Sequence, residues 1–147
     1  MRTIRASRSS DREELVRMLT ALWPDYEEAE VDDLLRVPIS AGILLVGERE
    51  GGGLCAFAQV GQRSCADGCV TSPVAYLEGI WTDADVRRSG LASELVREAN
   101  AWARSRGLTE FASDCELENH ESEAFHLAVG FQEEVLAILF RRDVSPE

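Results

Sequence analysis

The sequence has few basic residues and only two histidines. Its 147 residues include 15 Lys+Arg against 27 Asp+Glu, so the formal net charge is −12. Binding to nucleic-acid phosphates requires a basic surface, and this charge therefore argues against a nucleic-acid partner. The charge favours a cationic partner or substrate, although an acidic surface can also serve solubility alone.

Apolar segments of the length that membranes require are also missing. No segment reaches the roughly 18 apolar residues of a membrane-spanning helix, and the polar start MRTIRASRSS has no apolar core of a secretory signal. We therefore expect a cytoplasmic protein with no membrane partner. With 45% hydrophobic and 29% charged residues and no linker or repeat, the chain is expected to form one domain over residues 1–147.

The residues that most often bind transition metals do not have the spacing of a metal site. The chain contains no C-x-x-C pair, and its histidines follow no zinc-ligand pattern. We expect no metal and four free thiols, with Cys65 and Cys69 close enough in sequence to pair under oxidation. These residues are Cys55, Cys65, Cys69, Cys115, His120 and His126.

Hydrophobic periodicity predicts the order β-α-α-β-β-β-α-β-α-β. The first helix is expected to begin at a capping box formed by Ser10 and Glu13 and to end at Trp23-Pro24. Strands interleaved with helices after a meander favour an α/β fold with one mixed, mostly antiparallel sheet and helices on both faces. The other helices are expected at 26–36, 90–106 and 119–129, and the strands at 3–6, 42–48, 54–60, 74–82, 110–114 and from 131 to about 142.

A short basic loop separates the apolar strand at 74–82 from the amphipathic helix at 90–106. Such a loop aims unpaired backbone N–H groups and the positive end of the helix dipole at one point, which favours an anion. Gly90 would let the backbone approach a phosphate closely. A solvated basic turn is the alternative, because the loop matches neither phosphate-binding glycine motif. Its residues are Arg87, Arg88, Ser89, Gly90, Leu91 and Ala92.

Two carboxylates stand out as candidate functional groups. Glu78 lies inside an otherwise apolar strand, where a carboxylate is costly unless it is paired or used. Alternation along that strand predicts that Tyr76, Glu78 and Ile80 share one face. Asp114 ends a short strand, a common place for functional groups. The alternatives are a buried ion pair between Glu78 and an arginine, and a plain turn or cap role for Asp114.

These features together resemble the GNAT family of acyl-CoA-dependent N-acetyltransferases. The motif R-x-x-G-x-A lies between a strand and a helix, and N-x(6)-H-x(3)-G-F follows in the C-terminal part. Four further pieces are similar to the type I aminoglycoside 6′-N-acetyltransferases, namely Leu22-Trp23-Pro24, Ser72 to Ile80, Ala112-Ser113-Asp114 and Asn119. The resemblance implies a GNAT sheet that is splayed between its fourth and fifth strands, where the pantetheine arm of acetyl-CoA enters.

The resemblance also implies a role for each matching residue. The backbone of Ile80, Trp81 and Thr82 would pair with the pantetheine, the 87–92 loop would hold the pyrophosphate, and Asn119 would contact the cofactor arm. Trp23, Glu78 and Asp114 match positions that line the aminoglycoside site, and Tyr26 falls at a substrate-side position whose identity differs in the family. His126 stands where many GNAT enzymes have a tyrosine that protonates the departing thiolate. From the residues alone, Trp23 could be core packing and His126 an ordinary helix-face histidine.

The function implied by the resemblance is acetylation of the 6′-amine of aminoglycosides, with a possible role in antibiotic resistance and assembly as a homodimer. The amine would attack acetyl-CoA directly in a ternary complex, with Glu78 or Asp114 accepting its proton. A backbone N–H near Ile80 and Trp81 would stabilise the thioester oxygen. Two alternatives are a GNAT enzyme for a polyamine, small amine or peptide N-terminus, and a non-catalytic acyl-CoA-binding module. The pair of carboxylates argues against the second, because a binding module needs no proton acceptor.

Overall fold

The computed structural model describes residues 2–145, which form a larger unit ending at Asp114 and a smaller one beginning at Cys115. In the larger unit the elements are β1 (Thr3–Ala6), α1 (Arg12–Leu22), α2 (Glu28–Leu35), β2 (Gly42–Glu48), β3 (Leu54–Arg63), β4 (Val74–Thr82), α3 (Leu91–Ser105) and β5 (Phe111–Ser113), with short 3-10 turns at Ser9–Asp11 and Ala84–Val86. The smaller unit contains α4 (His120–Ala128). No helix among the described residues is long and apolar enough to cross a membrane.

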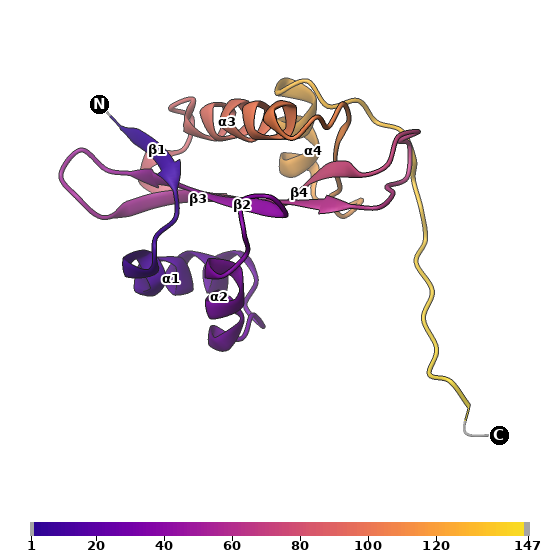
Figure 1. The fold of residues 1–147 in the computed structure, drawn as a ribbon, viewed down its shortest axis with the longest axis horizontal. Helices are drawn as coiled ribbons and strands as arrows, with labels where there is room; N and C mark the ends of the chain where they lie inside the picture. The colour runs from indigo at the N-terminus through magenta and orange to yellow at the C-terminus, as the bar shows by residue number, and fades with distance from the viewer. Residues whose placement is uncertain (1, 146–147) are drawn as a thin grey trace. The chain divides into compact units, whose positions relative to one another are not determined.

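The larger unit is built on a five-stranded sheet of order β1-β2-β3-β4-β5. The first four strands pair antiparallel, and β5 pairs parallel with β4. Helices α1 and α2 lie on one face of this sheet and α3 lies on the other (Figure 1). The predicted mixed, mostly antiparallel sheet with helices on both faces is therefore confirmed.

Each face of the sheet is covered by apolar side chains at the spacing that the sequence shows. On one face, α1 and α2 bury Leu15, Met18, Leu19 and Val31 against the sheet around Phe57. On the other, α3 buries the predicted stripe of Leu91, Leu95, Ala99, Trp102 and Ala103. Full burial of a large aliphatic or aromatic side chain contributes about 1.5–3 kcal/mol, so these two layers hold the helices against the sheet.

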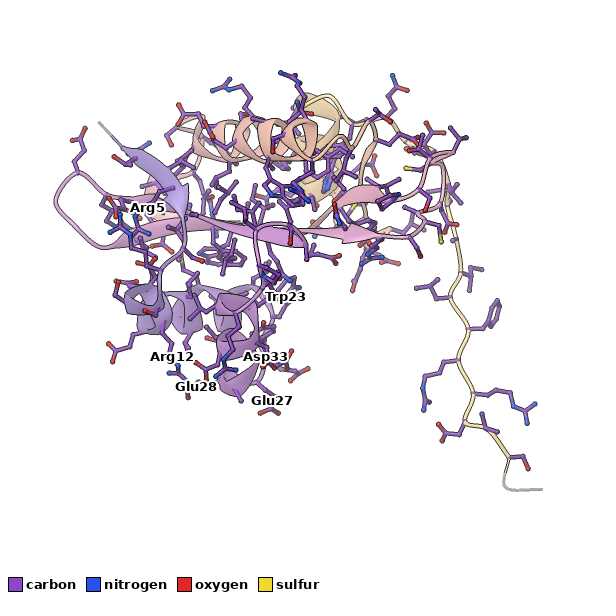
Figure 2. All side chains as sticks on the ribbon, viewed as in Figure 1. Arg5, Arg12, Trp23, Glu27, Glu28 and Asp33 are labelled. Carbon is purple, nitrogen blue, oxygen red and sulfur yellow. The ribbon has the colours of Figure 1, made fainter. Side chains whose placement is uncertain are left out.

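Ion pairs fix the two helices of the first layer to each other. The Arg12 guanidinium of α1 donates to Asp32 of α2 at 2.7 Å. It also donates to Glu28 at 3.0 Å, and Figure 2 labels Arg12 and Glu28. These partly exposed contacts link α1 to α2, and residues of α2 line the cavity described below.

A β-bulge interrupts the pairing of β3 with β4. Gln59 is paired with Gly79, but the next residue, Val60, is paired with Leu77, so Glu78 is the extra residue on β4. A bulge places two successive side-chain positions on the same face and shifts the alternation beyond it. The prediction that Ile80 shares the face of Tyr76 and Glu78 is therefore wrong.

Partners on each face show this shift. Arg63 contacts both Tyr76 and Glu78, which lie on the α1–α2 face. Beyond the bulge, Trp81 packs against the core cluster on that face. Ile80 is paired with Ala58 and thus faces α3, as Ala56 does beside Leu91.

Helix ends differ from the predicted ones at several positions. The predicted capping box at Ser10 is wrong, because Ser10 lies in the 3-10 turn and α1 begins only after Asp11. The Asp11 carboxylate instead accepts the backbone N–H of Arg8 at 2.8 Å and two N–H groups of Arg5 at 2.8 and 2.9 Å. The second helix is shorter than predicted, since residues 26, 27 and 36 lie outside α2.

The predicted last strand, from 131 to about 142, is wrong. Residues 131–145 have no helix or strand, and their large apolar side chains beyond Phe131 are exposed. An apolar run has the composition of a buried strand, but a strand exists only where a neighbouring strand pairs its backbone groups. The exposed residues are Val135, Leu136, Ile138, Leu139, Phe140 and Val144.

Candidate functional site

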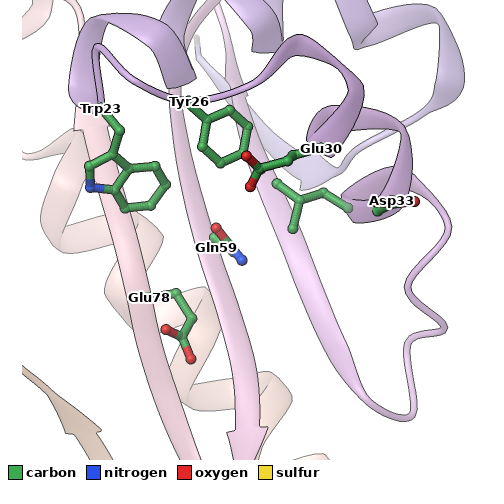
Figure 3. Close-up of a pocket in the computed structure, with 7 residues that line it drawn as sticks. Trp23, Tyr26, Glu30, Asp33, Gln59 and Glu78 are labelled. Atoms are coloured by element: carbon green, nitrogen blue, oxygen red, sulfur yellow. The ribbon is translucent and has the colours of Figure 1, made fainter. Parts of the chain in front are cut away.

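A cavity of about 350 Å³ opens between the end of α1, the helix α2 and the central strands. It brings together three residues that the sequence predicts at the acceptor site, Trp23, Tyr26 and Glu78 (Figure 3). Sequence reasoning missed its other polar residues, although the acidic character of the second helix was a signal for two of them. Those residues are Glu30, Asp33 and Gln59, and Leu34 completes the lining.

The aromatic wall of the cavity is made by two stacked rings. The centroids of Trp23 and Tyr26 are 5.7 Å apart, with an angle of 28° between their planes. Both side chains also pack against the core beneath α1 and α2. The core-packing alternative for Trp23 is thus present together with its exposure to the cavity.

The polar part of the cavity lining is mainly acidic. Burial raises the pKa of Tyr26 to about 12, and the nearby charges of Glu30 and Asp33 act in the same direction. Tyr26 is therefore a neutral hydrogen-bonding group at physiological pH. Three carboxylates line the cavity, and such a lining attracts a cation with several ammonium groups.

Glu78 forms an ion pair while it lines the cavity. The Arg63 guanidinium donates from Nε to Oε1 at 3.0 Å and from Nη2 to Oε2 at 2.7 Å. The side chain of Glu78 is 26% exposed and that of Arg63 is 45% exposed. The arginine partner that the alternative for Glu78 names is present, but the predicted burial of the pair is wrong, because both side chains are partly exposed.

Asp114 is connected to the same group of residues, although it does not line the cavity. The hydroxyl of Tyr76 donates a hydrogen bond to the Asp114 carboxylate. Burial, followed by this bond to Asp114, raises the pKa of Tyr76. The Arg63 guanidinium lies 3.5 Å above the centre of the Tyr76 ring. Glu78, Arg63, Tyr76 and Asp114 thus form one continuous chain of contacts.

The sheet is splayed where the resemblance places the pantetheine. β5 pairs only with Ala75, Tyr76 and Leu77 of β4, whereas β4 continues to Thr82. Within the described residues, the β4 segment from 78 to 82 has a strand partner on one side only, which is β3. Its free edge can pair with an extended ligand as a strand would.

The basic loop leads into α3 with a left-handed backbone. Gly90 is the N-cap of the 15-residue helix with φ of 85°, and Arg88 also has a positive φ of 62°. The predicted start of this helix at Gly90 is one residue early. A Cβ at Gly90 would meet no atom within 4 Å, so its backbone conformation, not crowding within the chain, favours glycine there. The first N–H groups of α3 point out of the helix beside this turn, and they fit an anionic phosphate.

Several side chains of the 87–92 loop are engaged within the protein itself. Arg87 Nε donates to the carbonyl oxygen of Thr82 at 3.0 Å, and its guanidinium lies 5.0 Å from the Trp81 ring centre. Ser89 donates to the carbonyl of Val86. Leu91 is buried under the helix, so only its backbone can bind a ligand. Arg88 and Ala92 are at least partly exposed.

Asn119 and His126 belong to the smaller unit, and their predicted roles stay predictions. The Asn119 side-chain oxygen accepts the N–H of Ser122 at 3.1 Å and caps α4. His126 Nδ1 lies 2.7 Å from the carbonyl oxygen of Ser122, which requires that Nδ1 carries the proton. The ring also contacts Phe125 and Phe131.

The residues of the described chain contain no group of three or more His, Cys, Asp or Glu side chains that could hold a metal ion. None of the four cysteines forms a disulfide; Cys55 is buried, Cys69 is partly buried, and Cys65 and Cys115 are exposed. The polar groups that line the cavity are three carboxylates, the phenol of Tyr26, the indole of Trp23 and the carboxamide of Gln59.

Comparison with known proteins gives this site its family. The sequence profile of the Acetyltransferase (GNAT) family matches residues 11–131, and the chain belongs to this family. It is 38% identical over 126 residues to the aminoglycoside N(6′)-acetyltransferase type 1 of Acinetobacter genomosp. 13, covering 84% of this chain and 86% of that protein. It is 37% identical over 131 residues to the enzyme of the same name from Serratia marcescens, covering 86% and 88%.

Solved structures agree with the sequence comparison. The crystal structure of the aminoglycoside antibiotic 6′-N-acetyltransferase AAC(6′)-Ih from Acinetobacter baumannii matches with a TM-score of 0.91 and 31% identity, over 99% of this chain and 100% of that one. The structure of AAC(6′)-Iy in complex with the bisubstrate analog CoA-S-monomethyl-acetylneamine matches with a TM-score of 0.91 and 28% identity, over 98% and 99%.

Proposed function

We propose that this chain transfers the acetyl group of acetyl-CoA to the 6′-amine of aminoglycoside antibiotics. The observation that carries the proposal is the cavity itself, in which Glu30, Asp33 and Glu78 surround a space walled by two aromatic rings. Relatives that cover more than four fifths of the chain bear the name of this activity. An aminoglycoside carries several ammonium groups, and the acidic lining complements them.

Acetyl-CoA is the acyl donor, and the chain offers backbone groups for both of its ends. The free edge of β4 at Ile80, Trp81 and Thr82 is suited to the pantetheine arm. The turn at Arg88, Ser89 and Gly90, with the start of α3, is suited to the pyrophosphate. We assign Asn119 to the same arm on the basis of the family motif.

The chemical step requires a neutral amine, because an ammonium group has no electron pair with which to attack a thioester. We assign proton acceptance to Glu78, since it lines the cavity, and attraction of the cationic acceptor to Asp114. A backbone N–H near Ile80 and Trp81 stabilises the negative charge that develops on the thioester oxygen. His126 gives a proton to the departing thiolate.

We further propose that the enzyme works in the cytoplasm as a homodimer and that its activity confers antibiotic resistance. Four cysteines with no disulfide among them are typical of a reducing compartment. The exposed apolar run from Val135 to Phe140 is the kind of surface that a second subunit covers. Sedimentation equilibrium tests the dimer: a species of 16.2 kDa at all concentrations would refute it.

The proposed activity is tested by thiol release from acetyl-CoA in the presence of purified protein. An aminoglycoside with a 6′-amine should be acetylated, and the same scaffold with a 6′-hydroxyl should not. Polyamines and peptides with free N-termini serve as comparison acceptors. Turnover confined to one of those would show a different acceptor, and acetyl-CoA binding without turnover on any amine would show a non-catalytic module.

A further inference from the structure

Arg63 occupies the place in the cavity region where a substrate cation would be expected. It lies at the end of β3, and its guanidinium makes two parallel hydrogen bonds with Glu78. Gly61, two residues before it on the same strand, has no side chain, and a Cβ there would lie 3.8 Å from Glu78 Oε1. The carboxylate of Glu78 is thus directed toward the end of β3, where a cation of the protein itself neutralises it.

The other carboxylates of the cavity have weaker partners. Asp33 pairs with Arg36 at 3.3 Å, and both side chains are more than 70% exposed, so solvent screens this pair. Glu30 accepts the backbone N–H of Glu27 at 3.2 Å, which leaves its charge in place. Arg63 therefore neutralises the cavity carboxylate that is least exposed and best paired.

The ion pair is built so that Arg63 can leave Glu78 without leaving the site. Almost half of the Arg63 side chain is exposed, at 45%. Its guanidinium also rests on the Tyr76 ring at 3.5 Å, and a cation held over an aromatic face keeps favourable interactions when one carboxylate is lost. Tyr76 in turn donates to Asp114, so a second carboxylate lies beyond the ring.

We propose that Arg63 is an internal counter-cation that competes with the acceptor ammonium group for Glu78 and so sets the affinity for cationic acceptors. The inference rests on the acceptor cavity of the proposed function. An incoming ammonium displaces the guanidinium from Glu78, and the guanidinium remains over Tyr76. Arg63 is a specificity-determining residue in this scheme, and it takes no part in proton transfer.

The test is the KM for an aminoglycoside in Arg63→Gln compared with the parent enzyme. Removing the competitor should lower KM by about two- to fivefold, the range that partly exposed ion pairs contribute. KM should also rise more steeply with salt than in the parent, because Glu78 then carries an unneutralised charge. Arg63→Lys keeps the charge without the paired N–H donors, and its KM should lie between those of the parent and Arg63→Gln. Arg104→Gln removes an equal charge from an exposed position of α3 and should change nothing.

A second measurement separates competition from a merely structural role. In a Glu78→Gln background, Arg63→Gln should no longer change KM, because the contested carboxylate is gone. The Kd for acetyl-CoA should be the same in all variants, which also shows that they fold. A parent that turns over no aminoglycoside would refute the proposed function. A normal parent with an Arg63→Gln variant whose KM is unchanged or raised, or whose effect persists without Glu78, would overturn this inference alone.

Discussion

The ring of Trp23 lies directly against the backbone of Gly79. A Cβ built at Gly79 would come 2.4 Å from Cη2 and 2.7 Å from Cζ2 of the indole, closer than atoms can approach. The bulge at Glu78 explains the contact, because it turns both Glu78 and Gly79 toward the α1–α2 face. Because Gly79 has no side chain, the indole of Trp23 can pack against β4 and form the aromatic wall of the acceptor cavity.

Gly79→Ala should displace the indole and reshape the acceptor cavity. We expect the KM for aminoglycosides to rise several-fold, and the stability to fall by about 1–3 kcal/mol, as overpacking does. The Kd for acetyl-CoA should stay within twofold, because the change lies on the acceptor side. Gly51→Ala is the control, since a Cβ there would meet no atom within 4 Å. Steady-state kinetics and calorimetry decide; an unchanged KM would show that Trp23 can move without cost.

Local patterns predict the strands of this fold well. The strands at 3–6, 42–48 and 74–82 have the predicted bounds, because the alternation and the turn residues that define them are local features of the sequence. The bulge at Glu78 could not be predicted in this way, since it depends on the register of β3 against β4. The predicted strand from 131 to about 142 is wrong for a related reason. Its composition favours a strand, but it has no pairing partner among the described residues.

The site was predicted only in part, because sequence motifs are local whereas the cavity is formed by tertiary packing. Trp23 and Glu78 lie in short motifs, Tyr26 falls at a family position whose identity differs, and the cavity brings all three together. Arg63 and Asp33 lie outside those motifs. The packing of α2 places Asp33 in the same cavity lining, and the end of β3 places Arg63 beside Glu78. The suggestion of an arginine partner for Glu78 came from the cost of a charge inside an apolar strand, which identifies the need but not the partner.

Substitution at the turn before α3 tests the cofactor loop. Gly90→Val should abolish measurable acetyl-CoA binding, because a β-branched residue does not adopt φ of 85° without strain. The double variant Arg87→Ala, Arg88→Ala should lose less, since the backbone N–H groups remain and Arg87 is engaged with Thr82. Calorimetry with acetyl-CoA measures both, and normal binding by folded Gly90→Val would remove this turn from the cofactor site.

The buried carboxylate of Asp11 predicts a pH-dependent stability. Hydrogen bonds from Arg5, its largest influence, hold the pKa of Asp11 below its usual range. A depressed pKa in the folded state adds stability that is complete above the unfolded pKa of about 3.9 and is lost as pH falls through the folded value.

Asp11→Asn should therefore cost about 1.5–3 kcal/mol at pH 7, because it removes the charge that accepts two hydrogen bonds from Arg5, while Arg5 keeps its pair with Glu48 at 2.6 Å. The difference from the parent should shrink as the pH falls below about 4. Urea unfolding at pH 7, 5 and 3 measures it. Glu14→Gln, at an exposed pair with Arg17, is the control and should cost no more than about 1 kcal/mol at any of these values. A pH-independent loss would show that Asp11 acts by packing only.

The proton on His126 Nδ1 limits how this residue can act. Since Nδ1 donates to the Ser122 carbonyl, the neutral ring has no proton on Nε2, and only the imidazolium can protonate a thiolate. We expect His126→Phe to lower kcat by roughly 10²-fold or more, because the variant has no proton to give to the thiolate. A drop of only two- or threefold would make His126 a structural residue of α4.

The two carboxylates should differ in whether their loss affects the chemical step. Glu78 lines the cavity, so Glu78→Gln should lower kcat, and it should also raise KM because the acceptor ammonium group loses this partner. High pH should restore part of the loss in kcat because more of the amine is already neutral. Asp114 lies behind Tyr76, so Asp114→Asn should raise KM, leave kcat nearly intact and lose its effect as salt increases. Tyr76→Phe removes the donor to Asp114 but leaves the ring beneath Arg63, and it should change neither kcat nor the response to Glu78→Gln. If Glu78→Gln and Asp114→Asn both acetylate aminoglycosides as the parent does at neutral pH, neither carboxylate accepts the proton of the amine. The group that accepts this proton would then lie elsewhere in the molecule.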